Sequence, residues 1–444
     1  FVKFSVEKDV LADAVSWTAR SLAQRPPSPV LAGILITTHE GIVRLEGFDY
    51  EISSHIEIPA DISEQGSILV SGKLLAEITR SLPNSTVTLE TEGSKISLAC
   101  GRSRFHLATM PVDEYPTLPA LPEIAGTIDG QAFAESVSQV IVAASKDDTL
   151  PVLTGIKVEI ENDLITFLAT DRYRLAMREL NWTPNQSEIS TSFLIKAKTL
   201  SEVAKTLSSS GELKLAISKN GEMIGFESAN RRTTSLLING EYPKIRSLFP
   251  SDTPIHATVR TSELIEAVRR VSVVAERNTP VRMAFTDGQL TLDAGTGEDA
   301  QAEEAIVAAL RGEDIVVAFN PTFLSEGLNS FNTDFVRFSF TSAPKPAMLT
   351  GQEKLDEEDQ DELQLTIFRW VAAAAHRFFV SGFRCISRSF HSRASARMRK
   401  PTCTLSRGST SWWGLTAWAR PTSSNPLVIW RILPPIGSAM MRRY

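Results

Sequence analysis

The stretch Pro-Val-Leu-Ala-Gly-Ile at residues 29–34 occurs again, with one change, as Pro-Val-Leu-Thr-Gly-Ile at residues 151–156. The shift is 122 residues, and the same shift carries Asp49 of Gly-Phe-Asp-Tyr onto Asp171 of Ala-Thr-Asp-Arg-Tyr. A repeat at a fixed period is the signature of a chain built from copies of one structural unit. The fold is therefore expected to be an array of similar domains of about 120 residues each.

Further matches extend this repeat to a third copy. Glu-Tyr-Pro at residues 114–116 returns at residues 241–243, and a fainter Pro-Val pair stands at residues 280–281, where a third copy requires it. Three helical stretches align through a shared glutamate, with shifts of 125 and 124: residues 71–82 through Glu77, 196–207 through Glu202 and 320–331 through Glu326. We therefore predict domains at residues 1–122, 123–252 and 253–362.

Each copy has the same predicted order of elements. A short strand (residues 2–6, 126–129 and 256–259) leads into an amphipathic helix, short strands follow, the second helix interrupts them, and further strands close the unit. In the first helix the apolar positions at helical spacing are Val10, Leu11, Ala14, Val15 and Leu22. Two helices with about eight strands per copy predict an α+β fold, in which the helices cover one face of an antiparallel sheet.

The composition is typical of a globular, cytoplasmic protein. Of the 444 residues, 42% are hydrophobic and 22% charged, and no run of 18 apolar residues is present. The first eight residues, Phe-Val-Lys-Phe-Ser-Val-Glu-Lys, lack the apolar stretch of a signal peptide. Cys100, Cys385 and Cys403 have no Cys-x-x-Cys or His-rich neighbourhood, so neither a disulfide framework nor a zinc site is indicated.

The charge is divided unevenly along the chain. Residues 363–444 contain no Asp or Glu but twelve Arg and one Lys, together with five of the seven Trp. Removing these 13 from the 46 basic residues leaves 33 against 52 acidic residues, so residues 1–362 carry −19 while the whole chain carries −6. We interpret residues 363–444 as a frameshifted, non-native tail. The alternative is a genuine basic appendage that binds nucleic acid.

Four motifs give the repeat a family resemblance. They are Arg-Pro-Pro-Ser-Pro-Val-Leu at 25–31, Ala-Thr-Asp-Arg-Tyr-Arg-Leu at 169–175, Glu-Tyr-Pro-Lys-Ile-Arg at 241–246 and Ala-Phe-Asn-Pro at 318–321. In this order, and inside a triple repeat, they resemble the bacterial sliding clamp, the β subunit of DNA polymerase III, over residues 1 to about 350. The resemblance implies three DNA-clamp domains per chain and a head-to-tail homodimer that closes a ring around duplex DNA without reading its sequence.

The same resemblance sets the expected partners and excludes others. It implies binding of the DNA polymerase III α subunit, the clamp loader and other clamp-binding-motif proteins, with no cofactor and no membrane. The implied function is processivity, because the ring tethers the replicative polymerase to DNA. An alternative is a duplicate clamp that serves repair or antibiotic resistance, which genetic essentiality would separate from a replicative one.

Ten basic residues are predicted to face DNA, because in the family the helices line the hole. They are Arg20 and Arg25 at the end of the first helix, Lys73 and Arg80 on the second, Lys146 after the third, Lys198 and Lys205 on the fourth, and Arg269, Arg270 and Arg277 on the fifth. The alternative for any one of them is an ordinary solvated charge. Their recurrence across the copies favours the channel, where phosphates attract cations.

A partner-binding groove is the second predicted surface. The resemblance places it between the second and third domains, where it accepts a short, largely apolar peptide. The matching residues are Leu153, Thr170, Arg172, Tyr173, Arg174, Leu175, Pro243, Leu248, Asn320, Phe323, Pro344 and Pro346. The alternative for the three leucines is a plain core position. The family ends with a strand of the type Met-Pro-Val-Arg-Leu, whereas this chain reads Leu-Gln-Leu-Thr-Ile-Phe-Arg-Trp at residues 363–370, so the last strand is predicted to be missing or altered.

No constellation of catalytic residues accompanies these surfaces. Residues 1–362 contain no metal-protease motif, nucleophile elbow or phosphate loop. Asp147 and Asp148 beside Lys146 are adjacent on a loop, where they cannot converge on one metal unaided. Asp49 and Asp171 are predicted to serve turns or buried hydrogen bonds. The chain is therefore predicted to be a binding protein without a catalytic or metal site, and the enzyme hypothesis is disfavoured.

Overall fold

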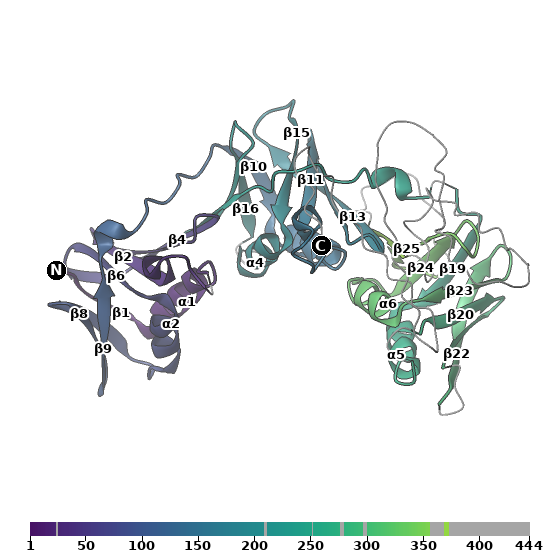
Figure 1. Cartoon of the computed structure of the whole chain (residues 1–444), viewed down its shortest axis with the longest axis horizontal. Helices are drawn as coiled ribbons and strands as arrows, with labels where there is room; N and C mark the ends of the chain where they lie inside the picture. Colours follow the sequence, from purple (N-terminus) through teal and green to yellow (C-terminus); the bar gives the residue numbers. More distant parts are fainter. Residues whose placement is uncertain are drawn as a thin grey trace, which may run out of the picture. The chain divides into compact units, whose positions relative to one another are not determined.

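The computed structural model describes residues 1–355 and 368–372, apart from residue 24, residues 208–210, residue 251, residues 276–278 and residues 296–299. Most of the predicted non-native tail therefore lies outside the described residues. Within them the same order of elements occurs three times, which confirms the α+β fold with three repeated domains (Figure 1).

The first repeat contains nine strands, two α-helices and two short 3-10 helices. They are β1 (Lys3–Glu7), α1 (Lys8–Ala19), η1 (Pro29–Ala32), β2 (Gly33–His39), β3 (Ile42–Phe48), β4 (Ile52–Pro59), β5 (Asp61–Glu64), β6 (Gly66–Ser71), α2 (Gly72–Ser81), β7 (Thr86–Glu92), β8 (Lys95–Cys100), β9 (Ser103–Met110) and η2 (Val112–Glu114). The repeated Pro-Val-Leu stretch is the short helix η1, which leads directly into β2.

The second repeat follows the same plan. Its elements are β10 (Ile124–Asp129), α3 (Gly130–Ile141), η3 (Pro151–Thr154), β11 (Gly155–Glu161), β12 (Leu164–Thr170), β13 (Arg174–Asn181), β14 (Thr183–Pro184), β15 (Ser190–Lys196), α4 (Ala197–Leu207), β16 (Glu212–Ile217), β17 (Met223–Ser228), β18 (Arg231–Leu236) and η5 (Arg246–Leu248).

The third repeat differs mainly in having one long strand where the others have two. It contains β19 (Ile255–Arg260), α5 (Thr261–Val271), β20 (Val281–Thr286), β21 (Gln289–Ala294), β22 (Ala302–Arg311), β23 (Ile315–Phe319), α6 (Pro321–Leu328), β24 (Phe335–Phe340), β25 (Ala347–Gln352) and β26 (Phe368–Ala372). The place of the last strand is thus occupied by β26, whose sequence Phe-Arg-Trp-Val-Ala differs from the Met-Pro type that the resemblance implies.

The two helices of each repeat pack side by side against the sheet of that repeat (Figure 1). In α1 the buried face consists of Leu11, Ala14, Val15, Trp17 and Thr18. Two parts of the predicted apolar face of this helix were wrong. Val10 is exposed, and the helix ends at Ala19, so Leu22 lies beyond it and packs against the core from the following turn. Hydrophobic spacing located the helix but not its end, because the chain leaves the helix through turns that keep an apolar residue in contact.

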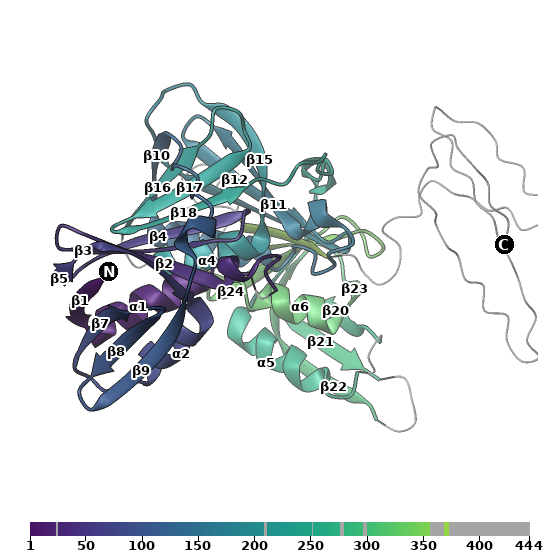
Figure 2. The ribbon, with the colours of Figure 1, turned by 60° about the vertical axis from the view of Figure 1, so that its left-hand side comes forward.

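The sheets continue from one repeat into the next. Residues Ile52–Ile56 of β4 pair antiparallel with Arg231–Ser235 of β18, which joins the first repeat to the second (Figure 2). Residues 174–178 of β13 pair in the same way with Phe368–Ala372 of β26, which joins the second repeat to the third. The paired positions on β4 and β13 are related by the shift of 122 residues, and each junction has five paired residues. We call this arrangement the junction pairing.

The prediction that Asp49 and Asp171 serve turns is confirmed. Oδ1 of Asp49 accepts hydrogen bonds from the main-chain N–H groups two and three residues ahead, at 2.9 and 2.7 Å, and Oδ1 of Asp171 does the same at 3.0 Å for both. The residues that follow them, Tyr50 and Arg172, have φ of 71° and 79°. Such left-handed backbone is costly for residues with a side chain, so the aspartate contacts offset local strain just before β4 and β13.

This turn generates a stability prediction. Replacing Asp49 by Ala removes the acceptor for two N–H groups, and the free energy of unfolding is expected to fall by about 1–2 kcal/mol. The measurement is the urea midpoint followed by circular dichroism. Asp49→Asn is the matched control, because its side-chain oxygen keeps the acceptor, and it should be destabilised less. Equal midpoints for Asp49→Ala and the unchanged chain would contradict the role of the turn.

Candidate nucleic-acid interface and partner-binding surface

The solvent-facing sides of α2 and α4 carry the same pattern of charges. Residues four and three apart lie on one side of a helix, and two such sets correspond with a shift of 125: Lys73, Glu77 and Arg80 on α2, and Lys198, Glu202 and Lys205 on α4. All four cations are exposed. The corresponding positions near α6 are Thr322, Glu326 and Asn329, so the third repeat keeps the glutamate and lacks the cations.

Two of the predicted DNA-facing cations instead reach across a junction between repeats. Arg20, the C-cap residue of α1, lies 3.8 Å from the carboxylate of Glu202 on α4. Lys146 donates a hydrogen bond of 3.0 Å to Oε1 of Glu326 on α6. The shared glutamate of the second helix therefore meets a cation of the preceding repeat at both junctions. Both cations keep much of their side chain exposed to solvent, so each stays available to a phosphate as well.

The remaining predicted cations divide into paired and unpaired groups. On α5, Arg269 pairs with Glu266 at 2.6 Å and Arg270 pairs with Glu304 at 2.6 Å. Lys205 lies 3.6 Å from Glu202. Within the part of the chain that the structure describes, no ion pair involves Arg25, Lys73, Arg80 or Lys198. Arg25 was predicted at the end of the first helix, which was wrong: it follows the helix by six residues, in the loop before η1. Arg277 lies outside the described residues.

The partner-binding surface centres on the turn between β12 and β13. Tyr242 is buried, and its hydroxyl oxygen accepts a 2.9 Å hydrogen bond from the main-chain N–H of Thr170. Burial raises the pKa of Tyr242, so the hydroxyl stays neutral. The hydroxyl of Thr170 in turn donates to the carbonyl of Arg174 at 2.7 Å. These contacts brace the turn from below and leave Arg172 and Tyr173 exposed at its tip.

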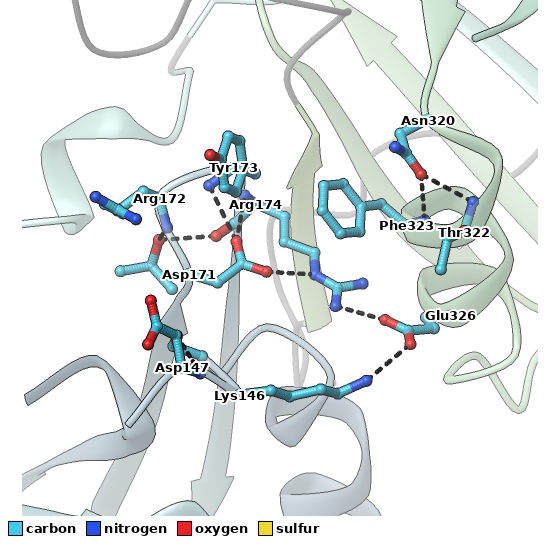
Figure 3. Close-up of polar contacts among 12 residues, drawn as sticks. Lys146, Asp147, Asp171, Arg172, Tyr173, Arg174, Asn320, Thr322, Phe323 and Glu326 are labelled. Atoms are coloured by element: carbon cyan, nitrogen blue, oxygen red, sulfur yellow. Dashed lines mark hydrogen bonds and ion pairs between the residues drawn. The ribbon is translucent and has the colours of Figure 1, made fainter. Parts of the chain in front are cut away.

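Arg174 links this turn to α6 (Figure 3). Its side chain is 3% exposed, its Nε donates to Oδ2 of Asp171 at 3.0 Å, and its Nη2 donates to Oε2 of Glu326 at 2.5 Å. The guanidinium carbon lies 4.5 Å from the ring centroid of Phe323, and that ring stacks with Tyr173 at 5.9 Å. Burial works to raise the pKa of Glu326, but hydrogen bonds and charges from Arg174 and Lys146 outweigh it, so the pKa lies below the usual glutamate value.

The other predicted groove residues lie around this cluster in different environments. Leu153 and Leu175 are buried in a small apolar cluster with Leu168, Met177 and Tyr242, against which Met348 of β25 packs. Leu248 is 43% exposed, so it is not a core residue. Oδ1 of Asn320 caps α6 by accepting from the N–H groups two and three residues ahead, at 3.0 and 3.2 Å. Pro243 and Pro344 are exposed, and Pro346 is half-buried just before β25.

Sequence reasoning missed the polar half of this surface. Asp171 was assigned to a turn and Glu326 only to a helix alignment, yet together they hold Arg174. Met348 was not predicted at all. The recurrence of the glutamate in three copies was the available signal, since an acidic residue at a constant offset suggests a repeated contact.

The carboxylates of the described residues do not form a metal site. Among those residues, no group of three or more His, Cys, Asp and Glu side chains is arranged to hold a metal ion. Asp147 accepts from the N–H and the hydroxyl of Thr149, at 3.0 and 2.7 Å, so its carboxylate serves its own loop. Of the helices that the structure describes, none has the length and apolar character needed to span a bilayer.

Family models match nearly all of the repeated region. The descriptions are DNA polymerase III beta subunit, N-terminal domain, for residues 2–119, the central domain for 127–244, and the C-terminal domain for 246–363. A protein named Beta sliding clamp from Micrococcus luteus is 61% identical over 309 residues, which is 70% of this chain and 100% of that protein.

Solved structures agree with this similarity. The crystal structure of the DNA polymerase sliding clamp from Bacillus subtilis is 28% identical, with a TM-score of 0.77, and covers 85% of this chain and 100% of its own. A DnaN sliding clamp from Pseudomonas aeruginosa, solved bound to griselimycin, has a TM-score of 0.76 at 23% identity, with coverage of 85% and 100%. The second likeness supports the fold alone.

The bracing of the turn by Tyr242 generates a second stability prediction. Tyr242→Phe leaves the buried N–H of Thr170 without its acceptor, and the free energy of unfolding is expected to fall by about 1–3 kcal/mol. The matched control is Tyr50→Phe in the first repeat, a tyrosine that is 55% exposed. Urea midpoints of the two variants decide, and a control that is destabilised as much as Tyr242→Phe would refute the assignment.

Proposed function

The chain belongs to the family of DNA polymerase III β subunits, the bacterial sliding clamps, and from that premise we propose that two copies join head to tail into a ring around duplex DNA. The ring tethers the DNA polymerase III α subunit to DNA, and at other times it binds the clamp loader or other proteins that carry a clamp-binding motif. The ring encloses DNA and attaches partner proteins to it, and this role requires no catalytic site in the clamp. A role on chromosomal DNA implies a cytoplasmic location.

The observation that carries this proposal is the junction pairing. In each described junction, the third strand after the first helix pairs with the last strand of the next repeat. The third repeat has the corresponding strand in β22, and the first repeat has the corresponding last strand in β9. These strands belong to opposite ends of the three-repeat array, so a second copy of the chain is the natural source of the missing partner.

Among the described residues, each of these two strands has an edge that is largely unpaired, where the pairing rule requires one. In β22, residues 302–307 pair with β21 on one side, and only residues 308–311 pair with β19 on the other. In β9, Ser103–Ala108 pair with β8, and only Thr109 and Met110 pair with β6. Unpaired edges of this kind are templates for association between chains.

The rule also gives the register between the copies. Val307 pairs with Gln289 as Pro59 pairs with Ile42, so residues 300–304 correspond to residues 52–56 of β4. Likewise Ser103–Leu107 correspond to Arg231–Ser235 of β18, because Ser103 pairs with Cys100 as Arg231 pairs with Ser228. Since His55 pairs with Arg232, Glu303 of one copy falls opposite Arg104 of the other. Both residues are exposed in the single chain, and opposite charges across strands stabilise the pairing.

The charged stripes of α2 and α4 supply the proposed DNA contacts. Sliding requires weak contacts to phosphates and none to base edges, and one cation on each side of a central glutamate suits that requirement. Arg25, at the loop before η1, adds a further exposed cation. Arg20, Lys146, Arg269 and Arg270 are proposed as secondary contacts, because each also has an acidic neighbour.

The partner peptide is proposed to bind over the junction between the second and third repeats. Tyr173, Phe323 and Leu248 offer exposed or half-exposed apolar surface there, with Leu153 and Leu175 beneath it. Arg172, Pro243, Asn320, Pro344 and Pro346 complete the proposed surface. Apolar side chains beside a few polar groups suit a short, largely apolar peptide.

A charge exchange tests the ring. Arg104→Glu places two acidic residues opposite each other and is expected to turn the dimer into a monomer at micromolar concentration, because like charges across strands repel. Adding Glu303→Arg in the same chain restores opposite charges and should restore the dimer. Light scattering coupled to gel filtration measures the mass. A monomeric unchanged chain, or an exchange that rescues nothing, would overturn the proposed interface.

A second charge reversal tests the DNA contacts. The double variant Lys198→Glu and Lys205→Glu should weaken binding to a short duplex at low salt and make its salt dependence shallower, by about 0.9 in the logarithmic slope for each phosphate that the variant no longer neutralises. Fluorescence anisotropy at several salt concentrations measures both. The control is Lys219→Glu, an exposed lysine beside Glu123 that faces no proposed contact. A control that weakens binding equally would mean that only net charge matters.

A further inference from the structure

Arg174 is a buried cation whose position depends on two carboxylates from different repeats. Asp171, from its own turn, holds Nε, and Glu326, from α6, holds Nη2. The third nitrogen, Nη1, is buried without a hydrogen-bond partner in the described chain. A guanidinium in such surroundings is stable only while its counter-charges stay in place, since an unpaired buried charge is costly.

The guanidinium in turn sets the position of an aromatic pair. Phe323 lies over it at 4.5 Å, well inside the range of a cation–π contact, and Tyr173 stacks on Phe323. Figure 3 shows Phe323 beside the guanidinium of Arg174, with Glu326 on the side of α6. Moving the guanidinium would therefore move the rings that form the apolar part of the proposed partner surface.

The two carboxylate oxygens of Glu326 form ion pairs of unequal strength. Oε1 accepts from Lys146, whose side chain is 82% exposed, and Oε2 accepts from Arg174, whose side chain is 3% exposed. Exposed ion pairs contribute little because water screens them, whereas removing one partner of a buried pair has a large effect. The contact with Arg174 is thus the one through which Glu326 acts.

The first junction offers an internal comparison without this arrangement. There the corresponding glutamate, Glu202, lies near Arg20 and Lys205 at 3.8 and 3.6 Å, and both are exposed. The residue that corresponds to Arg174 with the shift of 122 is Ile52, which carries no charge. We propose that Glu326 is a positioning residue for the partner surface, which holds Arg174 and through it the Phe323–Tyr173 pair without touching the bound peptide. This inference rests on the proposed partner surface.

The test uses as the probe a synthetic peptide with the clamp-binding motif of the DNA polymerase III α subunit, which is a partner proposed for this surface, and isothermal titration calorimetry on the full chain. Glu326→Gln keeps the volume of the side chain and removes its charge, and it should weaken peptide binding about tenfold. The matched control, Glu202→Gln, makes the same change at the first junction and should leave binding within about twofold. Lys146→Met removes only the exposed ion pair of Glu326 and should weaken binding less than about threefold.

A double-variant cycle separates positioning from a general disruption of structure. In the Arg174→Met background, Glu326→Gln should cause no further weakening, because its route of action is gone. Equal weakening in both backgrounds would overturn the inference, as would unchanged binding in Glu326→Gln alone. Folding is checked by circular dichroism. If Glu326→Gln does not fold, Glu326→Asp, which keeps the charge but shortens the reach, takes its place in the cycle.

Failure of the inference is distinguishable from failure of the proposed function. Absence of peptide binding to the unchanged chain would overturn the partner surface and this inference with it. Tight binding to the unchanged chain, with no difference in Glu326→Gln, would overturn the inference alone.

Discussion

Hydrogen bonding at the edges of the repeats is the constraint on which the rest of the molecule depends. A strand edge that faces water keeps its N–H and C=O groups unpaired and invites association. The chain satisfies two such edges internally, through β4 with β18 and β13 with β26, in one common register. Two further edges, on β9 and β22, are largely unpaired among the described residues, belong to opposite ends of the array and carry opposite charges at Arg104 and Glu303. The same pairing, applied between two copies, closes the proposed ring, and it requires no contact type that is absent from the single chain.

The junctions share a backbone plan and differ in their side chains, which is where the two proposed functions separate. The aspartate turn before β4 is followed by Ile52, whereas the one before β13 is followed by Arg174. The helix α4 presents two cations beside its glutamate, whereas α6 presents Thr322 and Asn329. The third repeat thus lacks the proposed phosphate contacts on its second helix, where Asn320 and Phe323 at the start of α6 belong to the proposed partner surface instead.

The sequence predicted the architecture better than the contacts. Nearly constant shifts of about 122–129 residues located three copies and six helices, because a repeat reports on every copy at once. The end of α1 was misplaced, since Leu22 keeps apolar contact after the helix has stopped. The contacts of Asp171 and Glu326 with Arg174 could not be predicted from the sequence. Arg174 and Glu326 are 152 positions apart, and residue spacing carries no information on such pairs. Whether residues 363–444 are native stays a prediction, as most of them lie outside the described residues.

The charge distribution is consistent with a protein that encloses DNA and does not need to bind it tightly. Residues 1–362 carry −19, so this region as a whole repels DNA, and the cations of α2 and α4 each share a helix face with a glutamate. Non-specific binding of useful strength needs many phosphate contacts at once, and its affinity falls steeply with salt. An open protein with so few unpaired cations on its described helices would dissociate quickly from DNA. A closed ring does not depend on that affinity, because release requires breaking the pairing between copies, and weak contacts then become an advantage for sliding.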